Sequence, residues 1–316
     1  MKPAWTAGVI RARLLLSRTI GAGLADEVAA SPSLDDGLAA LAGSAYGERV
    51  RAGQDLAAAQ RGVAETLLWH LRILAGWLPA GGGALMRVLA GWFELANIDA
   101  CLAALASGAR APSPFALGTL ATAWPAAERA RTIEELAGVL ARSSWDVPRG
   151  RVAAELAIGL RVAWGRRVRD AAPHARDWVE GAGALLVARE LLVARTRAHS
   201  EQLVRYPGID DRVLAADTLA ELRTALSPRA SWVLDTVSEP AELWRGELAW
   251  WERVEDDAHA LLRDMDDEPS VLAPVALLAV DAQRTARALQ SAAQGAAPET
   301  TEMLAGPRAR RFDGAL

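Results

Sequence analysis

The chain has 316 residues and a net charge of −4, and its composition is that of a helical protein. Hydrophobic residues make up 52% of it, many of them alanine and leucine, which are the best helix formers. Aromatic residues contribute only 5%, and the β-branched or aromatic runs typical of strands are scarce. The negative charge excludes the basic surface expected of a nucleic-acid-binding protein. We therefore predict an all-α fold with no nucleic-acid partner.

The stretch from Ile73 to Met86 has 14 residues without a charge and contains Pro79 and three consecutive glycines. A membrane span needs about 20 apolar residues. The chain has one cysteine, Cys101, which excludes an internal disulfide and fits a reducing cytosol. Its apolar neighbours predict a buried, unreactive thiol. We expect a soluble protein in the cytoplasm, able to sit beside a membrane.

In chain order, one pattern occurs three times at a spacing of about 90 residues. Each copy begins with Ser or Thr, has a leucine eight residues later and then reaches an aromatic residue. The copies are Ser33-Leu41-Tyr46, Thr132-Leu140-Trp145 and Thr218-Leu226-Trp232. The acidic residue three positions after each Ser or Thr (Asp36, Glu135 or Glu221) completes the pattern of a capping box. The repetition indicates three copies of one helical module.

Two breaks separate these modules. The first, from Gly108 to Pro114, contains two prolines, and the second is Tyr206-Pro207-Gly208. Proline lacks the backbone N–H and restricts the residue before it, so helices end at such places. We predict modules at residues 1–113, 114–205 and 206–316. The tail from Pro307 is expected to be disordered.

Each module is predicted to combine the short capped helix with an amphipathic helix and a mostly apolar one. The apolar residues of the amphipathic helices recur every three or four positions, so they share one face. They are Val63, Leu67, Leu71, Leu74 and Leu78 in the first module, and Trp244, Leu248, Trp251, Val254, Ala258, Leu261 and Met265 in the third. The apolar helices span about 85–107, 177–197 and 270–294, the last with Pro274 in its first turn. Helices that are apolar on most sides are sandwiched between neighbours.

One acidic motif offers a catalytic alternative. Asp264-Met265-Asp266-Asp267 matches the D-x-D-D pattern with which class II terpene cyclases donate a proton. The competing interpretation is that Asp266 and Asp267 cap a helix that begins near Pro269, because carboxylates favour a helix N-terminus. The two-metal pattern D-D-x-x-D is absent, since Leu261 and Leu262 follow Asp256-Asp257. An all-helical, terpenoid-cyclase-like enzyme using Asp264, Asp266 and Asp267 therefore stands as an alternative.

The other candidate motifs favour structural roles. The four histidines, His70, His174, His199 and His259, lack zinc-ligand spacing and are interpreted as surface or helix-end residues. Gly181-Ala182-Gly183 follows no predicted strand, which argues against a dinucleotide loop. Gly81-Gly82-Gly83 lacks the Gly-Lys-Ser/Thr of a phosphate loop and is interpreted as a hinge between two helices. We predict no catalytic, cofactor-binding or metal-binding residues, no small-molecule substrate and no enzymatic activity.

Four segments carry a resemblance to a known family. They are the opening Val9–Ser17 (V-I-R-A-R-L-L-L-S), the stretch Ser33-Leu34 to Tyr46-Gly47-Glu48, the segment Phe93-Glu94-Leu95-Ala96-Asn97-Ile98-Asp99, and Phe115-Ala116-Leu117-Gly118-Thr119-Leu120. These resemble motifs of the C-type subunit of the prokaryotic V/A-type rotary ATPases (V-type ATP synthases), whose counterpart in the eukaryotic V-type enzyme is the d-type subunit. The threefold internal repetition is also a trait of that family. The chain departs from its pattern at Leu102-Ala103-Ala104 and at Asp281-Ala282-Gln283-Arg284, and the family's contact residues stay unplaced.

This resemblance implies a mechanical role. Members of the family are all-helical, funnel-like proteins of three modules with pseudo-threefold symmetry. They are non-catalytic central-stalk (rotor) components that receive the central shaft, formed by the D and F type subunits, and sit on the proteolipid (c/K) ring. They couple ATP hydrolysis or synthesis to proton or sodium transport and are peripheral on the cytoplasmic face of the membrane. A generic helical scaffold protein is the remaining alternative.

Overall fold

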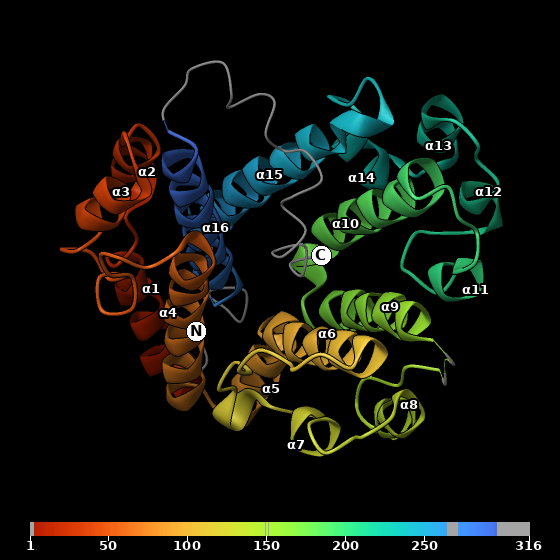
Figure 1. Cartoon of the computed structure of the whole chain (residues 1–316), viewed down its shortest axis with the longest axis horizontal. Helices are drawn as coiled ribbons and strands as arrows, with labels where there is room; N and C mark the ends of the chain where they lie inside the picture. The colour runs from red at the N-terminus through yellow and green to blue at the C-terminus, as the bar shows by residue number, and fades with distance from the viewer. Residues whose placement is uncertain (1–2, 149, 151, 264–270, 296–316) are drawn as a thin grey trace. The chain divides into compact units, whose positions relative to one another are not determined.

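The computed structural model describes residues 3–148, 150, 152–263 and 271–295 (Figure 1). All regular secondary structure in these ranges is helical, and none of the residues in them lies in a strand, which confirms the all-α prediction. The described residues form two compact units. We call the residues up to Gly83 together with those from Val254 the terminal unit, and Ala84–Arg253 the central unit. The division into modules at residues 113 and 205 stays a prediction.

The terminal unit joins the two ends of the described chain. After a 3₁₀ turn, η1 (Pro3–Trp5), its helices are α1 (Thr6–Leu16), α2 (Gly21–Ala29), α3 (Leu34–Ala40), α4 (Leu56–Trp77) and α16 (Leu272–Ala293). Helix α16 packs against α1, α2, α3 and α4, and α1 also packs against α4 (Figure 1). The sequence predicted this last apolar helix and Pro274 in its first turn, and both are confirmed. Its packing partners, however, come from the opposite end of the chain.

Helix α4 follows its predicted amphipathic pattern. The Asp55 carboxylate accepts the N–H of Ala58 at 2.7 Å and so caps the first turn. The stripe Val63, Leu67, Leu71 and Leu74 is buried, as predicted, and Leu78 beyond the helix is half-buried.

The glycine run after α4 is not the hinge that the sequence suggested. The chain breaks at Leu78 and Pro79, and Gly81–Gly83 already lie in the first turn of α5 (Ala80–Leu89). A Cβ on Gly82 would come within 3.1 Å of the Trp5 ring and 2.7 Å of Leu78. The glycine there allows the helix to pack closely, which explains its presence better than flexibility does.

The central unit contains the remaining helices. In chain order they are the rest of α5, α6 (Gly91–Ser107), η2 (Gly118–Leu120), α7 (Trp124–Ala127), α8 (Ile133–Arg142), α9 (Ala153–Ala171), η3 (Pro173–Ala175), α10 (Arg176–Ala188), the π-helical segment η4 (Arg189–Val193), α11 (Ser200–Leu203), α12 (Asp211–Leu214), α13 (Leu219–Ala225), α14 (Pro228–Ser231), η5 (Trp232–Leu234), η6 (Pro240–Glu242) and α15 (Leu243–Arg263). The last ten residues or so of α15 belong to the terminal unit.

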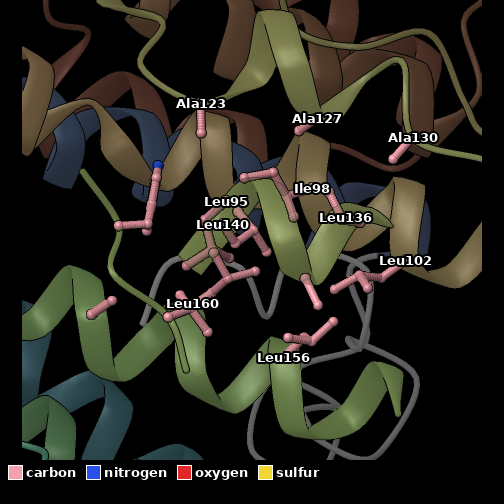
Figure 2. Close-up of a cluster of buried hydrophobic side chains, with 14 residues drawn as sticks. Leu95, Ile98, Leu102, Ala123, Ala127, Ala130, Leu136, Leu140, Leu156 and Leu160 are labelled. Atoms are coloured by element: carbon pink, nitrogen blue, oxygen red, sulfur yellow. The ribbon is translucent and has the colours of Figure 1, made fainter. Parts of the chain in front are cut away.

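Helix α6 packs against α7, α8 and α9, and their apolar side chains form one core (Figure 2). Its members include Leu95, Ile98 and Leu102 from α6, Leu136 and Leu140 from α8, and Leu156 and Leu160 from α9. Further along the chain, α10 packs against α9 and α14. Each of these groups places a mostly apolar helix at its centre, as the sequence predicted for helices that are apolar on most sides.

The predicted helix over residues 85–107 is interrupted. Helix α5 ends at Leu89 and α6 begins at Gly91, with a bend of 44° between them. The Trp164 indole donates to the carbonyl of Val88 at 2.9 Å, and a Cβ on Gly91 would lie 3.0 Å from the same ring. The indole therefore takes the hydrogen bond that the Val88 carbonyl would accept from the next turn of a continuous helix, and its ring fills the space beside Gly91. No single described helix has the length and apolarity to cross a membrane, although α5 and α6 taken together meet that test across their bend.

The other predicted boundaries hold more closely. Gly108 ends α6 in the left-handed conformation, with φ of 71°, and Gly208 has φ of 82° in the second break. In the first half of α15 the buried residues are Leu243, Gly246 and Trp250, whereas the predicted Trp244, Leu248 and Trp251 are only half-buried. The Trp250 indole donates to the carbonyl of Trp178 at 2.7 Å, which holds it inward. Val254 and Ala258 are buried, as expected.

Candidate functional site

The most prominent polar feature of the central unit is Glu94, a carboxylate on α6 that is only 1% exposed. It accepts the backbone N–H groups of Thr122, Ala123 and Trp124 at 2.7–2.8 Å, at the start of α7. It also accepts the Trp145 indole N–H at 2.9 Å and the Thr122 hydroxyl. A carboxylate suits this place because the first turn of a helix presents free N–H groups and a positive dipole end.

One turn further along α6, Asn97 holds the segment that leads into η2. Its side-chain oxygen accepts the N–H of Phe115 at 2.7 Å, and its amide donates to the carbonyl of Phe115 at 3.0 Å. The Phe115 ring packs edge-on against Phe93 with the ring centroids 5.2 Å apart. Glu94 and Asn97 together therefore fix the connection between α6 and α7.

The terminal unit contains a similar arrangement around Asp281 on α16, which is 3% exposed. Its two carboxylate oxygens accept the N–H groups of Ile20 at 3.2 Å and Gly21 at 2.9 Å, at the start of α2. The Tyr46 hydroxyl donates to it at 2.8 Å. Burial raises the pKa of Asp281, and the bonds from Gly21, Tyr46 and Ile20 oppose that rise. The pKa of Tyr46 is raised well above its usual value by burial and by the Asp281 charge.

A third buried carboxylate, Glu180 on α10, is 4% exposed. It forms an ion pair with Arg176 at 2.8 Å and accepts the Ser227 hydroxyl at 3.2 Å. Its side chain lies against Gly208, since a Cβ there would come 3.3 Å from the carboxylate. The aromatic residue of this copy, Trp232, packs against Gly181 and donates its indole N–H to the carbonyl of Arg229. Glu180 is therefore a buried carboxylate like Glu94 and Asp281, but the aromatic residue of its copy, Trp232, donates its indole N–H elsewhere.

The three capping motifs found in the sequence all form. Asp36, Glu135 and Glu221 donate their backbone N–H groups to the hydroxyl oxygens of Ser33, Thr132 and Thr218 at 3.1–3.2 Å. Only the third closes the full capping box, with the Glu221 carboxylate accepting the N–H of Thr218. Tyr46 and Trp145, the aromatic residues that end the first two copies, are the side chains that reach Asp281 and Glu94.

Sequence reasoning missed these three carboxylates as a set. In the sequence, Glu94 stands out only as part of a family motif, Asp281 only as a departure from one, and Glu180 not at all. The signal that could have found them is an acidic residue inside a mostly apolar helix. Such a residue can be buried only if several donors meet it. Apart from Arg176, which lies one turn from Glu180, the donors here come from segments 28 to 261 residues away in the sequence.

The proposed proton-donor motif lies outside the described residues, because Asp264, Asp266 and Asp267 fall in the range 264–270. Asp256, on α15, is exposed, and Asp257 is half-buried. Within the described ranges, no cluster of three or more His, Cys, Asp or Glu side chains has the geometry to hold a metal ion. Cys101 is half-buried beside the α6–α9 core, and burial raises the pKa of its thiol, which favours the protonated, unreactive form.

The histidines differ in their surroundings. His174 and His259 are exposed, and His199 lies 2.6 Å from the Glu190 carboxylate near η4. His70 corrects the prediction of a surface or helix-end residue, since it is 4% exposed in the middle of α4. Burial, together with the charges of Arg18, Arg11 and Arg49, lowers its pKa to about 4. His70 is therefore neutral at neutral pH.

A scan of the chain against models of protein families finds no matching family. A search of curated proteins likewise finds no relative that matches it.

Proposed function

We propose that the chain is a non-catalytic central-stalk subunit of a V/A-type rotary ATPase. In this role it is the socket between the central shaft and the membrane proteolipid ring, and it transmits rotation between ATP chemistry and the transport of protons or sodium ions. It has the pseudo-threefold, funnel-like arrangement of three modules that the resemblance implies. It works in the cytoplasm, at the inner face of the membrane.

The observation that carries this proposal is the repeated contact between a buried carboxylate and the end of a capped motif. Asp281 with Tyr46 and Glu94 with Trp145 have the same elements, although the acid-bearing helix comes last in the chain in the first case and first in the second. In both, an apolar helix bears the acid, the N–H groups at the start of a short helix meet it, and the aromatic residue after the next short helix closes it. Duplicated modules predict such equivalent contacts.

The position of α16 supports the same reading. In the central unit, each acid-bearing helix precedes in sequence the segments that it holds, as Glu94 on α6 precedes α7 and α8. In the terminal unit, the acid-bearing helix is the last described helix, and it packs against α2, α3 and α4. The final described helix thereby completes the first of the proposed modules.

Residues of the resembling segments also take part in the buried polar contacts described above. Asn97, from the third resembling segment, holds Phe115, which begins the fourth, and Glu94, from the same segment, holds the backbone at Thr122. Tyr46, from the second, meets Asp281. A socket that transmits torque has to be stiff, and buried, fully bonded polar contacts between densely packed helices provide stiffness.

The direct test is capture of partners by the full chain. The tagged protein is incubated at low salt with detergent-solubilised membranes from its own organism, and the captured proteins are identified by mass spectrometry. We expect the proteolipid of the ring and the D and F type shaft proteins, and none of them with the tag alone. A Glu94→Gln variant, expected to be loosened in its central unit, is the matched control and should capture less. Capture of neither ring nor shaft proteins would contradict the proposal.

A further inference from the structure

Helix α1 of the terminal unit exposes an apolar face. Ile10 is 54% exposed and Leu14 is 57% exposed. The two residues are four positions apart, so they project from the same side of the helix, one turn from each other. The other side of α1 bears the buried residues Val9, Ala12 and Leu15 and packs against α4 and α16. The exposed side therefore offers two large aliphatic side chains to solvent.

A third exposed apolar side chain lies near this helix. Trp77, at the end of α4, is 54% exposed. Its backbone is close to α1, because a Cβ on Gly8 would lie 3.1 Å from the Trp77 carbonyl oxygen. Six large apolar side chains in the described ranges are at least 38% exposed, and three of them are thus on α1 or beside it. Scattered apolar residues are normal on a protein surface, whereas a group of them marks an interaction surface.

The segments that carry these side chains are positively charged. The first acidic residue of the chain is Asp26, and no acidic residue lies between Glu65 and Glu94. Arg13 on α1 and Arg18 just after it are both exposed. No carboxylate in the described part of the terminal unit forms an ion pair with either of them. In a chain whose net charge is −4, this surplus of positive charge is local to the exposed apolar group.

We propose that α1 binds the surface of a membrane that contains anionic phospholipid. Ile10 and Leu14 enter the boundary between the headgroups and the acyl chains, and Arg13 and Arg18 are attracted to the negative headgroups. Trp77 suits the same boundary, because an indole combines an apolar ring with a polar N–H group. The bilayer thus covers the side of α1 that the protein leaves exposed.

A fluid anionic surface fits this face better than a protein partner does. Protein interfaces orient their partners through shaped pockets and directed hydrogen bonds. Here the face is the outer side of one helix, and the exposed Ser17 hydroxyl on that side already donates to the Leu14 carbonyl at 2.8 Å. Apolar side chains and unpaired positive charge remain, and these are what attachment to a bilayer requires. The inference does not rest on the rotary-ATPase role, in which contact with the membrane is made through the proteolipid ring.

The test is flotation of the full chain with protein-free vesicles, so that no ring or shaft protein contributes. One set of vesicles is phosphatidylcholine, and the other is phosphatidylcholine with phosphatidylserine. We expect binding to the second set only, and we expect it to weaken as salt is added, because salt screens the attraction between arginines and headgroups. Capture of the ring and shaft proteins is a separate measurement, so either proposal can fail without the other.

Variants on the exposed face should weaken the binding without unfolding the protein. The double variant Ile10→Gln/Leu14→Gln should lose about ten-fold or more in partition coefficient, because it removes the apolar groups that enter the bilayer. Arg13→Gln should lose about five-fold, the contribution of one cation near an anionic surface. Val193→Gln and Arg212→Gln, which change exposed residues of the same kinds in the central unit, are the matched controls and should bind like the unchanged protein.

The unfolding midpoint of each variant checks that the fold is intact. Failure of the unchanged protein to bind the phosphatidylserine vesicles would overturn the proposal. Equal binding by the Ile10→Gln/Leu14→Gln variant would do the same, since the contact would then lie elsewhere. Sedimentation of the chain without vesicles distinguishes a further occupant. A dimer that the double variant abolishes, together with no vesicle binding, would assign the face to a second copy and also overturn the proposal.

Discussion

At the scale of single residues, Glu94 is committed to structure rather than to chemistry. Both of its oxygens are engaged, one by three backbone N–H groups and the other by the Thr122 hydroxyl and the Trp145 indole. A general base needs a free lone pair directed at a substrate proton, and this carboxylate has none to offer. The guanidinium of Arg167 stacks on the Trp145 ring at 4.8 Å; burial lowers the pKa of Arg167, and the Glu94 charge opposes that fall.

Glu94→Gln tests this role. The amide keeps the size of the side chain, but its NH₂ group would face donors, and Arg167 would lose a compensating charge. We expect the free energy of unfolding to fall by about 3 kcal/mol, since hydrogen bonds to a buried charge contribute about 1.5–3 kcal/mol each and would be only partly lost. Chemical denaturation measures this. Glu128→Gln, at an exposed position after α7, is the control and should change stability by no more than about 0.5 kcal/mol.

His70 gives the stability of the terminal unit a predictable dependence on pH. Its pKa in the folded protein is about 4, below the ordinary value of 6.5, so the unfolded chain binds the proton more readily. The stability that neutral His70 provides is therefore complete above pH 6.5 and is lost as the pH falls toward 4. By linkage, the loss reaches about 2 kcal/mol at pH 5.

The measurement is the unfolding free energy between pH 7.5 and pH 5 in chloride buffer, compared with that of His70→Leu. The variant should lose about 2 kcal/mol less over this range than the unchanged protein. Equal pH dependence in both proteins would mean that His70 titrates normally in the fold.

At the scale of helices, close approach depends on glycine where large aromatic rings lie between elements. Tyr206, in the break after α11, is 6% exposed and packs between Gly165 of α9 and Gly183 of α10. A Cβ on Gly165 would lie 2.6 Å from the ring, and one on Gly183 would overlap it. The Gly-Ala-Gly sequence of α10 is thus explained by packing, in agreement with the interpretation that it is not a dinucleotide loop.

Gly183→Ala should destabilise the central unit by about 1–3 kcal/mol, because the added methyl group forces the Tyr206 ring to move. Alanine raises intrinsic helix stability, so a loss must come from the clash rather than from propensity. Gly181 provides no such test, since it meets Trp232 instead. Thermal unfolding of Gly183→Ala, of Tyr206→Leu and of the double variant separates the cost of the clash from the change in helix propensity. The second change should cost less in the Gly183→Ala background than in the unchanged protein, and additive costs would contradict the clash.

At the scale of the whole molecule, the two compact units have different relations to the sequence. The central unit is one continuous segment, whereas the terminal unit needs α16 from the other end of the chain. Helix α16 buries most of its side chains against α1–α4 and supplies Asp281 to the start of α2. During synthesis, the first helices of the chain therefore lack their main partner until residue 293 has been made.

A truncation after Arg263 tests this dependence. Without α16, the apolar faces of α2, α3 and α4 lose their cover, so we expect amide protection in residues 3–83 to disappear. Protection in residues 84–253 should be largely retained, because that unit has its own core. Hydrogen exchange read by mass spectrometry measures both. A truncation after Gly295, which keeps α16, is the matched control, and persistent protection of α4 in the shorter protein would contradict the expectation.

Local signals in the sequence were sufficient for much of the fold. The three Ser/Thr caps, the apolar stripe of α4 and the breaks at Gly108 and Gly208 depend on residues within a few positions of one another, and each formed, although only the cap at Thr218 closes the full capping box. The bend before Gly91 and the burial of Trp250 instead of Trp251 could not be predicted in this way. They result from Trp164 and Trp178, which lie 73 and 72 positions away.

By itself, the sequence determined the helical class, the repeated capped motif and the most apolar helices, because propensity, capping and periodicity act over short distances. Only the tertiary structure decided that α16 packs with the beginning of the chain and which donors surround Glu94, Glu180 and Asp281. It also decided that His70 is buried beside arginines. The physical reason is that burying a charge or a polar ring is tolerable only when distant segments bring their hydrogen bonds and charges to it, and no local pattern records that meeting.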